Sequence, residues 1–237
     1  MRIEMRWVGV AILAVTMATG CAGTAPRGTA PAAQAAAATV VPGADAKPEA
    51  LVAGVLPAAR LDRPAPLMQA LKNRRSERNY SDRKLSIPQV ADILWAANGV
   101  NRDDGKHTSP SAMNKQGVDI YAVTADGVFL YDPVKHALSQ VATGDLRKEM
   151  GGQEFVAVAA LNLAYVADTE VLKTEWAAVA VGCMAQNVGL YCATGGLGNV
   201  VRGWFEQEKV AKALALKPNQ SVVLTQTVGY PKEAGKP

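Results

Sequence analysis

Residues 174–196 read TEWAAVAVGCMAQNVGLYCATGG, a long and almost wholly apolar stretch. It contains no proline and ends in two glycines, a pattern typical of a helix closed by a glycine cap. Gln186 and Asn187 lie in its middle, where polar side chains would be costly in lipid. We therefore predict a helix buried in a protein core, with these two side chains able to satisfy neighbouring buried backbone.

The segments on either side of this helix indicate strands. Residues 118–132, VDIYAVTADGVFLYD, predict a hairpin around Asp126 and Gly127, and residues 137–141 add a short strand. Residues 156–166 predict a buried strand and residues 220–231 a final one, with an amphipathic helix over 206–214 between them. Helices mixed with hairpin-linked strands favour an α+β fold with a central mixed, mostly antiparallel sheet flanked by helices.

Two further helices are predicted before the first hairpin. In LSIPQVADILWAANG, residues 85–99, Ser86 is the expected N-cap, Pro88 stands in the first turn, and Gly99 follows the last turn. Residues 65–75, APLMQALKNRR, place Leu67, Ala70 and Leu71 on one face.

A cluster of bases follows this apolar face in ALKNRRSERNYSD, residues 70–82. Arg74 falls on the same helical face as Leu67 at i+7, so we predict that it points inward and needs an anionic partner. The alternative is a solvated helix end, where cations are favoured by the helix dipole. A net charge of +4 and 5% aromatic residues argue against a nucleic-acid partner.

The N-terminus has the pattern of an export signal. Residues 1–20 combine a basic start with a short apolar run, and ATGC resembles a bacterial lipobox that would lipidate Cys21. The alternative is an ordinary signal peptide cut near the same place. Residues 21–57 are rich in alanine and proline and predict a tether, which leaves 58–237 as the folded domain. We expect an exported lipoprotein, anchored to a membrane by its lipid on the periplasmic side or at the cell surface.

Cysteines and histidines offer little catalytic chemistry. Nine residues of helix separate Cys183 from Cys192 by about 13–14 Å, too far for a disulfide, so we predict two unpaired core cysteines. With only two histidines, His107 and His136, which we expect at the surface, a multi-histidine metal site is disfavoured.

Four motifs occurring in order then resemble one family. RRSERNYSD, PSAMNKQ, AVGCMAQNVGLYCATGGLG and VGYP together resemble the FMN-dependent nitroreductase superfamily, over about residues 61–231. LYDPVKHAL and WAANGVNRDDGKHTSPSA look more specifically like the branch of thiazole/oxazole (azoline) dehydrogenases. That branch usually has Tyr-Pro after the Pro-Ser, whereas this chain reads PSAMNKQGVDIY.

The resemblance implies a nitroreductase-like fold with FMN at a homodimer interface. It implies phosphate and ring-edge contacts from the arginine cluster, ring contacts from the glycine segment and from a loop often supplied by the partner subunit, and a phosphate contact from a base after the last strand. Lys232 and Lys236 are the available bases there, and Gln186 and Asn187 are alternative flavin neighbours. The implied cofactor-binding residues are Arg74, Arg75, Ser76, Arg78, Ser111, Asn114, Gln116, Gly195, Gly196, Leu197, Gly198 and Lys236.

The sequence is compatible with three functions. The first is an FMN-dependent oxidoreductase that moves two electrons from NAD(P)H or another small-molecule donor to an acceptor, with no catalytic side chain and no metal. The second is a flavin-binding interaction lipoprotein with little turnover. The third is a flavin-free anion-binding domain. Ser111 and Asn114 could also be plain loop caps, and Gly195 a plain helix cap.

Overall fold

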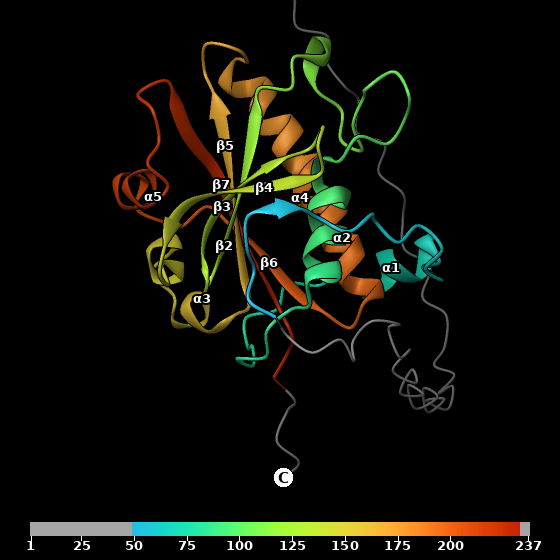
Figure 1. Cartoon of the computed structure of the whole chain (residues 1–237). Coiled ribbons are helices and arrows are strands. Elements are labelled where there is room, and N and C mark those ends of the chain that lie inside the picture. The colour runs from blue at the N-terminus through green and yellow to red at the C-terminus, as the bar shows by residue number, and fades with distance from the viewer. Residues whose placement is uncertain (1–48, 233–237) are drawn as a thin grey trace, which may run out of the picture. The chain divides into compact units, whose positions relative to one another are not determined.

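The computed structural model describes residues 49–232. Its centre is a seven-stranded sheet in the order β1-β4-β3-β2-β5-β7-β6 (Figure 1). Every pairing between these strands is antiparallel, so the sheet is not the mixed one expected. The strands are β1 (Gly54–Val55), β2 (Val118–Thr124), β3 (Gly127–Asp132), β4 (Ala137–Thr143), β5 (Leu161–Asp168), β6 (Gly198–Arg202) and β7 (Gln220–Gly229).

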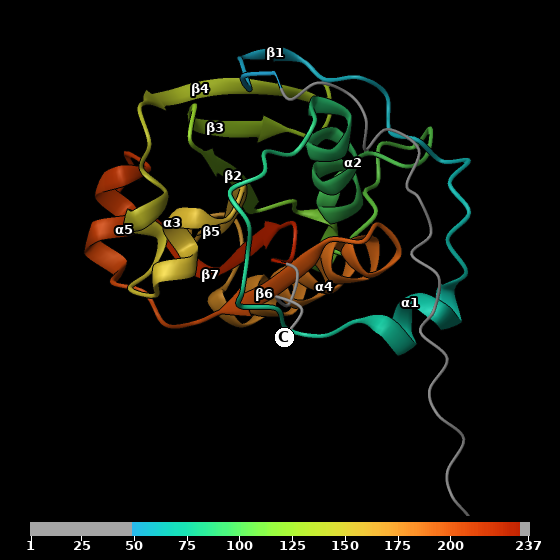
Figure 2. The same cartoon turned by 90° about the horizontal axis from the view of Figure 1, so that it is seen from below.

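Helices pack on both faces of this sheet (Figure 2). The long helix α4 and helix α2 cover one face, while α3 and α5 cover the other. The helices are α1 (Leu67–Asn73), α2 (Ile87–Asn98), α3 (Glu154–Val158), α4 (Thr174–Thr194) and α5 (Gln207–Ala213), with short 3-10 turns η1 (Ala112–Asn114) and η2 (Arg147–Met150). The predicted α+β class is confirmed.

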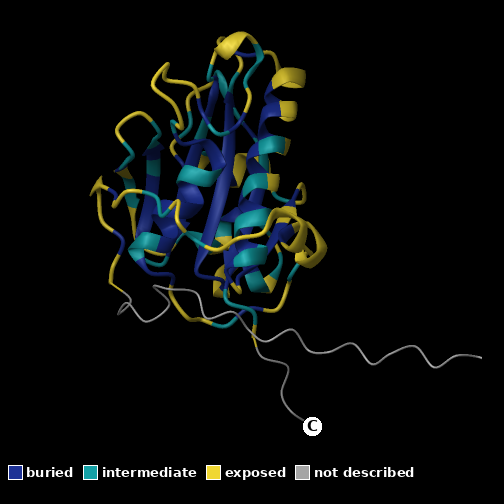
Figure 3. Ribbon diagram, turned by 90° about the vertical axis from the view of Figure 1, so that its right-hand side faces the viewer, coloured by how far each residue is buried: buried dark blue, intermediate teal, exposed yellow. Residues whose placement is uncertain are grey.

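Alternating side chains of the central strands feed two separate cores. Ile120 of β2 and Tyr165 of β5 point to the core under α2 and α4. Tyr121 and Val166, one residue further along each strand, point to the core under α3 and α5. Figure 3 shows these strands and the inner sides of the helices buried. Both sheet faces are therefore covered, which fits the strongly apolar strand sequences.

The predicted helix boundaries are confirmed where the sequence has clear caps. Ser86 caps α2 in a capping box, in which the Gln89 side chain accepts from the Ser86 backbone N–H at 2.9 Å. Gly195 is the C-cap of α4. In the part of the chain that the structure describes, α4 is the one helix whose length and composition would allow a membrane span. Its buried side packs into the core instead.

Two predicted elements differ from the structure. The strand expected over residues 156–166 begins only at Leu161, because α3 and a bend occupy residues 154–160. Helix α1 ends at Asn73, and Arg74 follows with an extended backbone (φ −58°, ψ 121°). The helical face of Leu67 therefore does not continue to Arg74.

The fold also includes chain expected to belong to the tether. Strand β1 pairs with β4, and Leu51 and Leu56 are buried in the core under α2. Residues 51–56 thus belong to the folded domain, although the sequence pattern placed them in the tether. The predicted signal at 1–20, Cys21 and most of the tether lie outside the described residues, as does Lys236.

Candidate functional site

The arginine segment after α1 is docked against the start of β6. Ser76 forms a parallel bridge with Asn199, and the Glu77 N–H donates to the Asn199 carbonyl at 2.8 Å. The same segment reaches the end of β7, where the Lys232 N–H donates to the Asn79 carbonyl at 2.9 Å. Two predicted site segments and the basic residue after the last strand are therefore brought together.

Arg74 is exposed, so its predicted inward orientation is wrong. Its aliphatic stem lies on α4, where a Cβ atom added at Gly189 would be 3.6 Å from the Arg74 Cγ. Glu77 is 3.9 Å from Arg75, whose side chain is 79% exposed. Among residues 49–232, neither Arg74 nor Arg78 forms a salt bridge. Three guanidinium groups thus stand at the surface with donors free for an anion.

A hollow of about 450 Å³ opens beside Arg78. Arg78 and Lys232 line it from one side, and Glu154, Phe155 and Val158 of α3 line it from the other. Nearby, the Gln153 Oε1 atom is buried with no hydrogen-bond partner in the described chain. Sequence reasoning missed Gln153, because an unpartnered amide oxygen is visible only in three dimensions.

The glycine segment caps α4 and then enters the sheet. The N–H groups of Gly195 and Leu197 both donate to the Cys192 carbonyl, at 3.0 and 3.1 Å, so they are not available to a ring. Gly196 is exposed with φ +65°, a left-handed conformation that favours glycine. Gly198 is buried at the first position of β6. Of the predicted ring contacts, Gly196 has the most accessible backbone.

The loop residues Ser111, Asn114 and Gln116 lie elsewhere on the same chain. Gly117, which follows them, accepts from the Asp168 N–H at 3.0 Å and packs against Leu172, just before α4 begins. The arginine and glycine segments lie toward the other end of α4 (Figure 1). The chain just before the loop reaches further along α4, because Asn187 Nδ2 donates to Ser109 Oγ at 3.2 Å. Among the described residues, no hydrogen bond joins Ser111, Asn114 or Gln116 to the arginine segment.

This loop is held by its own hydrogen bonds. The Gln116 N–H donates to Ser111 Oγ at 3.1 Å, and Gln116 Nε2 donates to Asn114 Oδ1 at 2.9 Å. Met113, Asn114 and Gln116 all have positive φ near 50°. Such conformations are uncommon for residues other than glycine, so the loop has a specific shape, with Met113 and Asn114 exposed.

Arg202 is a buried cation that sequence reasoning missed. It is 5% exposed and donates to Thr227 Oγ1, the Met150 carbonyl and Asn162 Oδ1. No carboxylate of the described chain pairs with it, and burial lowers the pKa of its guanidinium to about 10. Its place on a strand gave no pattern from which to predict this network.

The remaining titratable residues and the cysteines correct or confirm smaller expectations. His107 is 5% exposed, with no partner for its Nδ1 among the described residues, so it is not the surface residue expected. His136 is partly exposed and lies between the Tyr131 hydroxyl and the Pro57 carbonyl. Cys183 and Cys192 are unpaired, as predicted. Cys192 is buried in the core, while Cys183 is half-buried.

The donor set of the arginine segment fits a phosphorylated cofactor such as FMN. Phosphate oxygens are bound well by guanidinium forks. Three guanidinium groups are exposed in this segment, and one of them, Arg78, lines the hollow together with Lys232. The buried Gln153 Oε1 could accept from a ring N–H. A flavin offers both a phosphate and such a donor, so the arrangement describes a flavoprotein site.

Comparison with known proteins identifies the family. The sequence profile of the nitroreductase family matches residues 71–230. A curated protein of Methanocaldococcus jannaschii, named as a nitroreductase, is 30% identical over 168 residues, 64% of this chain and 85% of the relative. The chain belongs to the nitroreductase family.

Solved structures agree. A Ralstonia eutropha protein described as a nitroreductase has a TM-score of 0.72 at 36% identity, covering 76% of this chain and 90% of its own. A Desulfovibrio desulfuricans nitroreductase in complex with FMN has a TM-score of 0.53 at 25% identity, and the match covers 73% of this chain and 92% of that structure's chain. A chain of the Escherichia coli microcin synthetase complex shares the fold, with a TM-score of 0.59 at 23% identity. The match covers 74% of this chain and 79% of that one. The predicted nitroreductase-like fold is confirmed.

Proposed function

We propose that the chain is an FMN-dependent oxidoreductase that moves two electrons from NAD(P)H or another small-molecule donor to an acceptor. The observation that carries this proposal is the docking of three exposed arginines against the start of β6, beside a hollow that holds Lys232. The relative from Desulfovibrio desulfuricans with FMN bound supports the choice of cofactor.

The residues have separate tasks in this proposal. Arg74, Arg75 and Ser76 bind the phosphate, and Arg78 and Lys232 add positive charge around it. Gly196 presents its exposed backbone, while Gln153 accepts a hydrogen bond from the ring edge. The flavin supplies the redox chemistry, so the chain needs to bind and orient it rather than provide a nucleophile.

A homodimer completes the proposed site. Among the described residues, no hydrogen bond joins Ser111, Asn114 or Gln116 to the arginine segment, so we infer that a second copy brings them to the same flavin. Exposed apolar side chains favour such an assembly, including Leu67 and Met68 of α1 and Trp176 and Val179 of α4.

The proposed location is outside the cytoplasm, anchored through Cys21. This proposal rests on the signal and lipobox pattern of residues 1–21. NAD(P)H is scarce there, so a different donor, or a substrate oxidised by the flavin directly, is an equal part of the proposal. Labelling with a radioactive fatty acid, compared between the natural chain and Cys21→Ser, tests the anchor; equal labelling would exclude it.

The visible absorbance spectrum of the purified protein tests the cofactor. We expect a flavin spectrum, or its appearance after incubation with FMN. Stopped-flow mixing of the loaded protein with nicotinamides, quinones, nitroaromatics and azoline peptides then tests turnover. A protein that binds FMN but exchanges electrons with none of these would contradict the enzyme and leave a flavin-binding protein.

A further inference from the structure

A second cavity shares no lining residue with the hollow at Arg78. It has a volume of about 280 Å³ and lies between the segment before α1, helix α2 and the last turn of α4. Its volume is near the lower end for small-molecule sites, about 300–1,000 Å³. Most of the lining is apolar, from Leu61, Leu67, Ala96 and Leu190. The half-buried Trp95 adds an aromatic wall.

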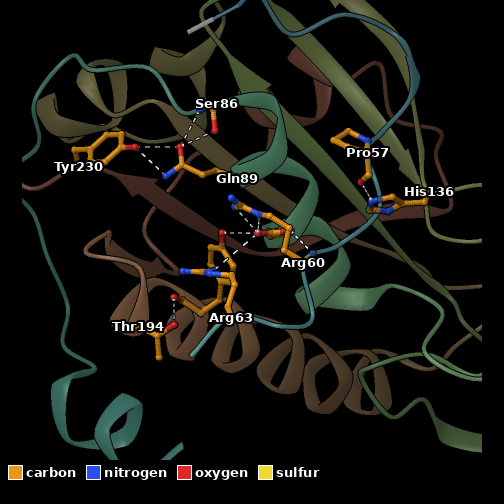
Figure 4. Close-up of polar contacts among 10 residues, drawn as sticks. Pro57, Arg60, Arg63, Ser86, Gln89, His136, Thr194 and Tyr230 are labelled. Carbon is orange, nitrogen blue, oxygen red and sulfur yellow. Dashed lines mark hydrogen bonds and ion pairs between the residues drawn. The ribbon is translucent and has the colours of Figure 1, made fainter. Parts of the chain in front are cut away.

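The polar floor of this cavity is built around one buried carboxylate. Asp92, 3% exposed, accepts from the Arg60 backbone N–H at 3.0 Å and from its guanidinium at 2.9 and 2.6 Å. The Tyr191 hydroxyl donates to the same carboxylate at 3.0 Å. Figure 4 shows Arg60 and Arg63 side by side, close to Thr194 at the end of α4. The Asp92 oxygens are thus already occupied.

Arg63 is the residue in this cluster that lacks an acceptor. Its side chain is 11% exposed, and its guanidinium stacks over the Tyr191 ring with 4.4 Å between the guanidinium carbon and the ring centroid. Its nearest acid is Asp92, at 3.9 Å, beyond hydrogen-bond distance. Among residues 49–232, no group accepts a hydrogen bond from the Arg63 side chain. Its guanidinium donors therefore remain available at the cavity.

Among the described residues, the Arg63 guanidinium lacks a close counter-ion. The Asp92 carboxylate is 2.6 Å from the Arg60 Nη2 atom but 3.9 Å from the Arg63 Nη1 atom. An uncompensated charge away from water is costly unless it is paired and hydrogen-bonded. A carboxylate entering the cavity would complete the pair and accept a bidentate bond from the Arg63 fork. The apolar walls would at the same time cover a hydrocarbon body.

We propose that this cavity binds a small organic acid, with its carboxylate on Arg63 and its apolar body against Trp95 and Leu190. Arg63 also lies close to the glycine segment, because a Cβ atom added at Gly195 would be 3.2 Å from the Arg63 Nη2. The binding inference itself does not depend on a flavin, because every group that carries it belongs to this chain.

Isothermal titration calorimetry of the full-length, FMN-loaded protein tests the site. The probe is hydrocinnamate, an aryl acid, and its neutral amide is the matched ligand control. We expect saturable one-to-one binding of the acid, and affinity for the amide at least about tenfold lower, since a charge-assisted bond is lost. Repeating the titration without added FMN separates this result from the fate of the proposed function.

Variants assign the binding to Arg63. Arg63→Gln should weaken hydrocinnamate binding at least about tenfold while leaving affinity for the amide unchanged. Arg63→Lys keeps the charge and should retain part of the affinity. It serves as the test variant if Arg63→Gln folds poorly. Arg83→Gln is the matched control, because Arg83 also stacks on a tyrosine, 3.9 Å from the Tyr230 ring centroid, but outside the cavity.

Three results would overturn the proposal. One is the absence of hydrocinnamate binding by the natural chain, as when a partner subunit or residues 1–48 fill the cavity. Another is equal affinity for the acid and the amide. The last is unchanged binding of the acid by Arg63→Gln.

Discussion

Gly198 lies directly against Glu77: a Cβ atom at position 198 would be 2.6 Å from the Glu77 Cγ and 2.7 Å from its Cβ. Both contacted atoms are at the base of the side chain, so they cannot move away without moving the backbone. We predict that Gly198→Ala displaces the arginine segment from β6. The expected cost is about 1–3 kcal/mol of unfolding free energy, as for other overpacked sites. Urea denaturation measures it.

The same displacement should weaken FMN binding, because the arginines on either side of Glu77 would move together. Fluorescence titration of FMN checks this. Gly152→Ala is the control, since an added Cβ there has no neighbour within 4 Å. A Gly198→Ala protein with the stability and FMN affinity of Gly152→Ala would show that the contact at Glu77 does not position the segment.

Arg74→Ala should lower FMN affinity at least about tenfold, because a charge-assisted bond to phosphate contributes about 1.5–3 kcal/mol. Fold stability should change little, since Arg74 is exposed. Lys72→Ala, two residues earlier and also exposed in the last turn of α1, is the control for general charge. Equal FMN affinity in the two variants would remove Arg74 from the site.

Asp92→Asn should be strongly destabilising. The carboxylate is 4% exposed, pairs with Arg60 and accepts the Tyr191 hydroxyl, so an amide would lose an ion pair at a buried position. Breaking a buried ion pair typically costs about 3–5 kcal/mol. Tyr191→Phe, which removes one hydrogen bond and keeps the charges, should cost about 0.5–1.5 kcal/mol. Thermal unfolding of both variants measures which one loses more stability. A smaller loss of stability for Asp92→Asn than for Tyr191→Phe would contradict this account.

The sequence predicted the elements that local signals define. Ser86 and Gln89 mark the start of α2 within its first turn, and alternating apolar residues identify β2 and β3. The error at Arg74 has a local cause as well: helical spacing placed it inward, but the chain becomes extended at that residue. Spacing predicts a face only as far as the helix continues.

The site was predictable only in its motifs. The docking of Ser76 on Asn199 joins residues far apart in the chain, and no local pattern indicates such a pairing. The buried cation Arg202 and the unpartnered Gln153 Oε1 depend on their surroundings in the same way. The cluster of Arg63, Asp92 and Tyr191 likewise comes from three separate elements, so no motif in the sequence records it.

His107 should make stability depend on pH. Burial lowers its pKa from the ordinary value near 6.5, so the folded state binds its proton more weakly than the unfolded state. Its contribution to stability is then present above pH 6.5 and is lost as pH falls through the lower, folded-state pKa. We expect the free energy of unfolding to decrease from pH 7 to pH 5, and to decrease less in His107→Gln.

Urea denaturation at a series of pH values measures this difference. His136, whose pKa burial also lowers, acts in the same direction, so the double variant should be flatter still. Parallel curves for the natural chain and His107→Gln would show that the buried ring does not titrate differently in the folded protein.

The exposed apolar face of α4 gives the last prediction. Val179 is 60% exposed and Trp176 is 52% exposed, one turn apart on the helix that separates the two groups of site residues. If a second copy covers this face, Val179→Arg would bury an unpaired charge and should yield monomers by size-exclusion chromatography with light scattering. The monomeric variant should also bind FMN more weakly, because Asn114 of the second copy would be absent from the site. Val134→Arg, at a position 77% exposed between β3 and β4, should remain a dimer. A Val179→Arg dimer with normal FMN affinity would place the interface elsewhere.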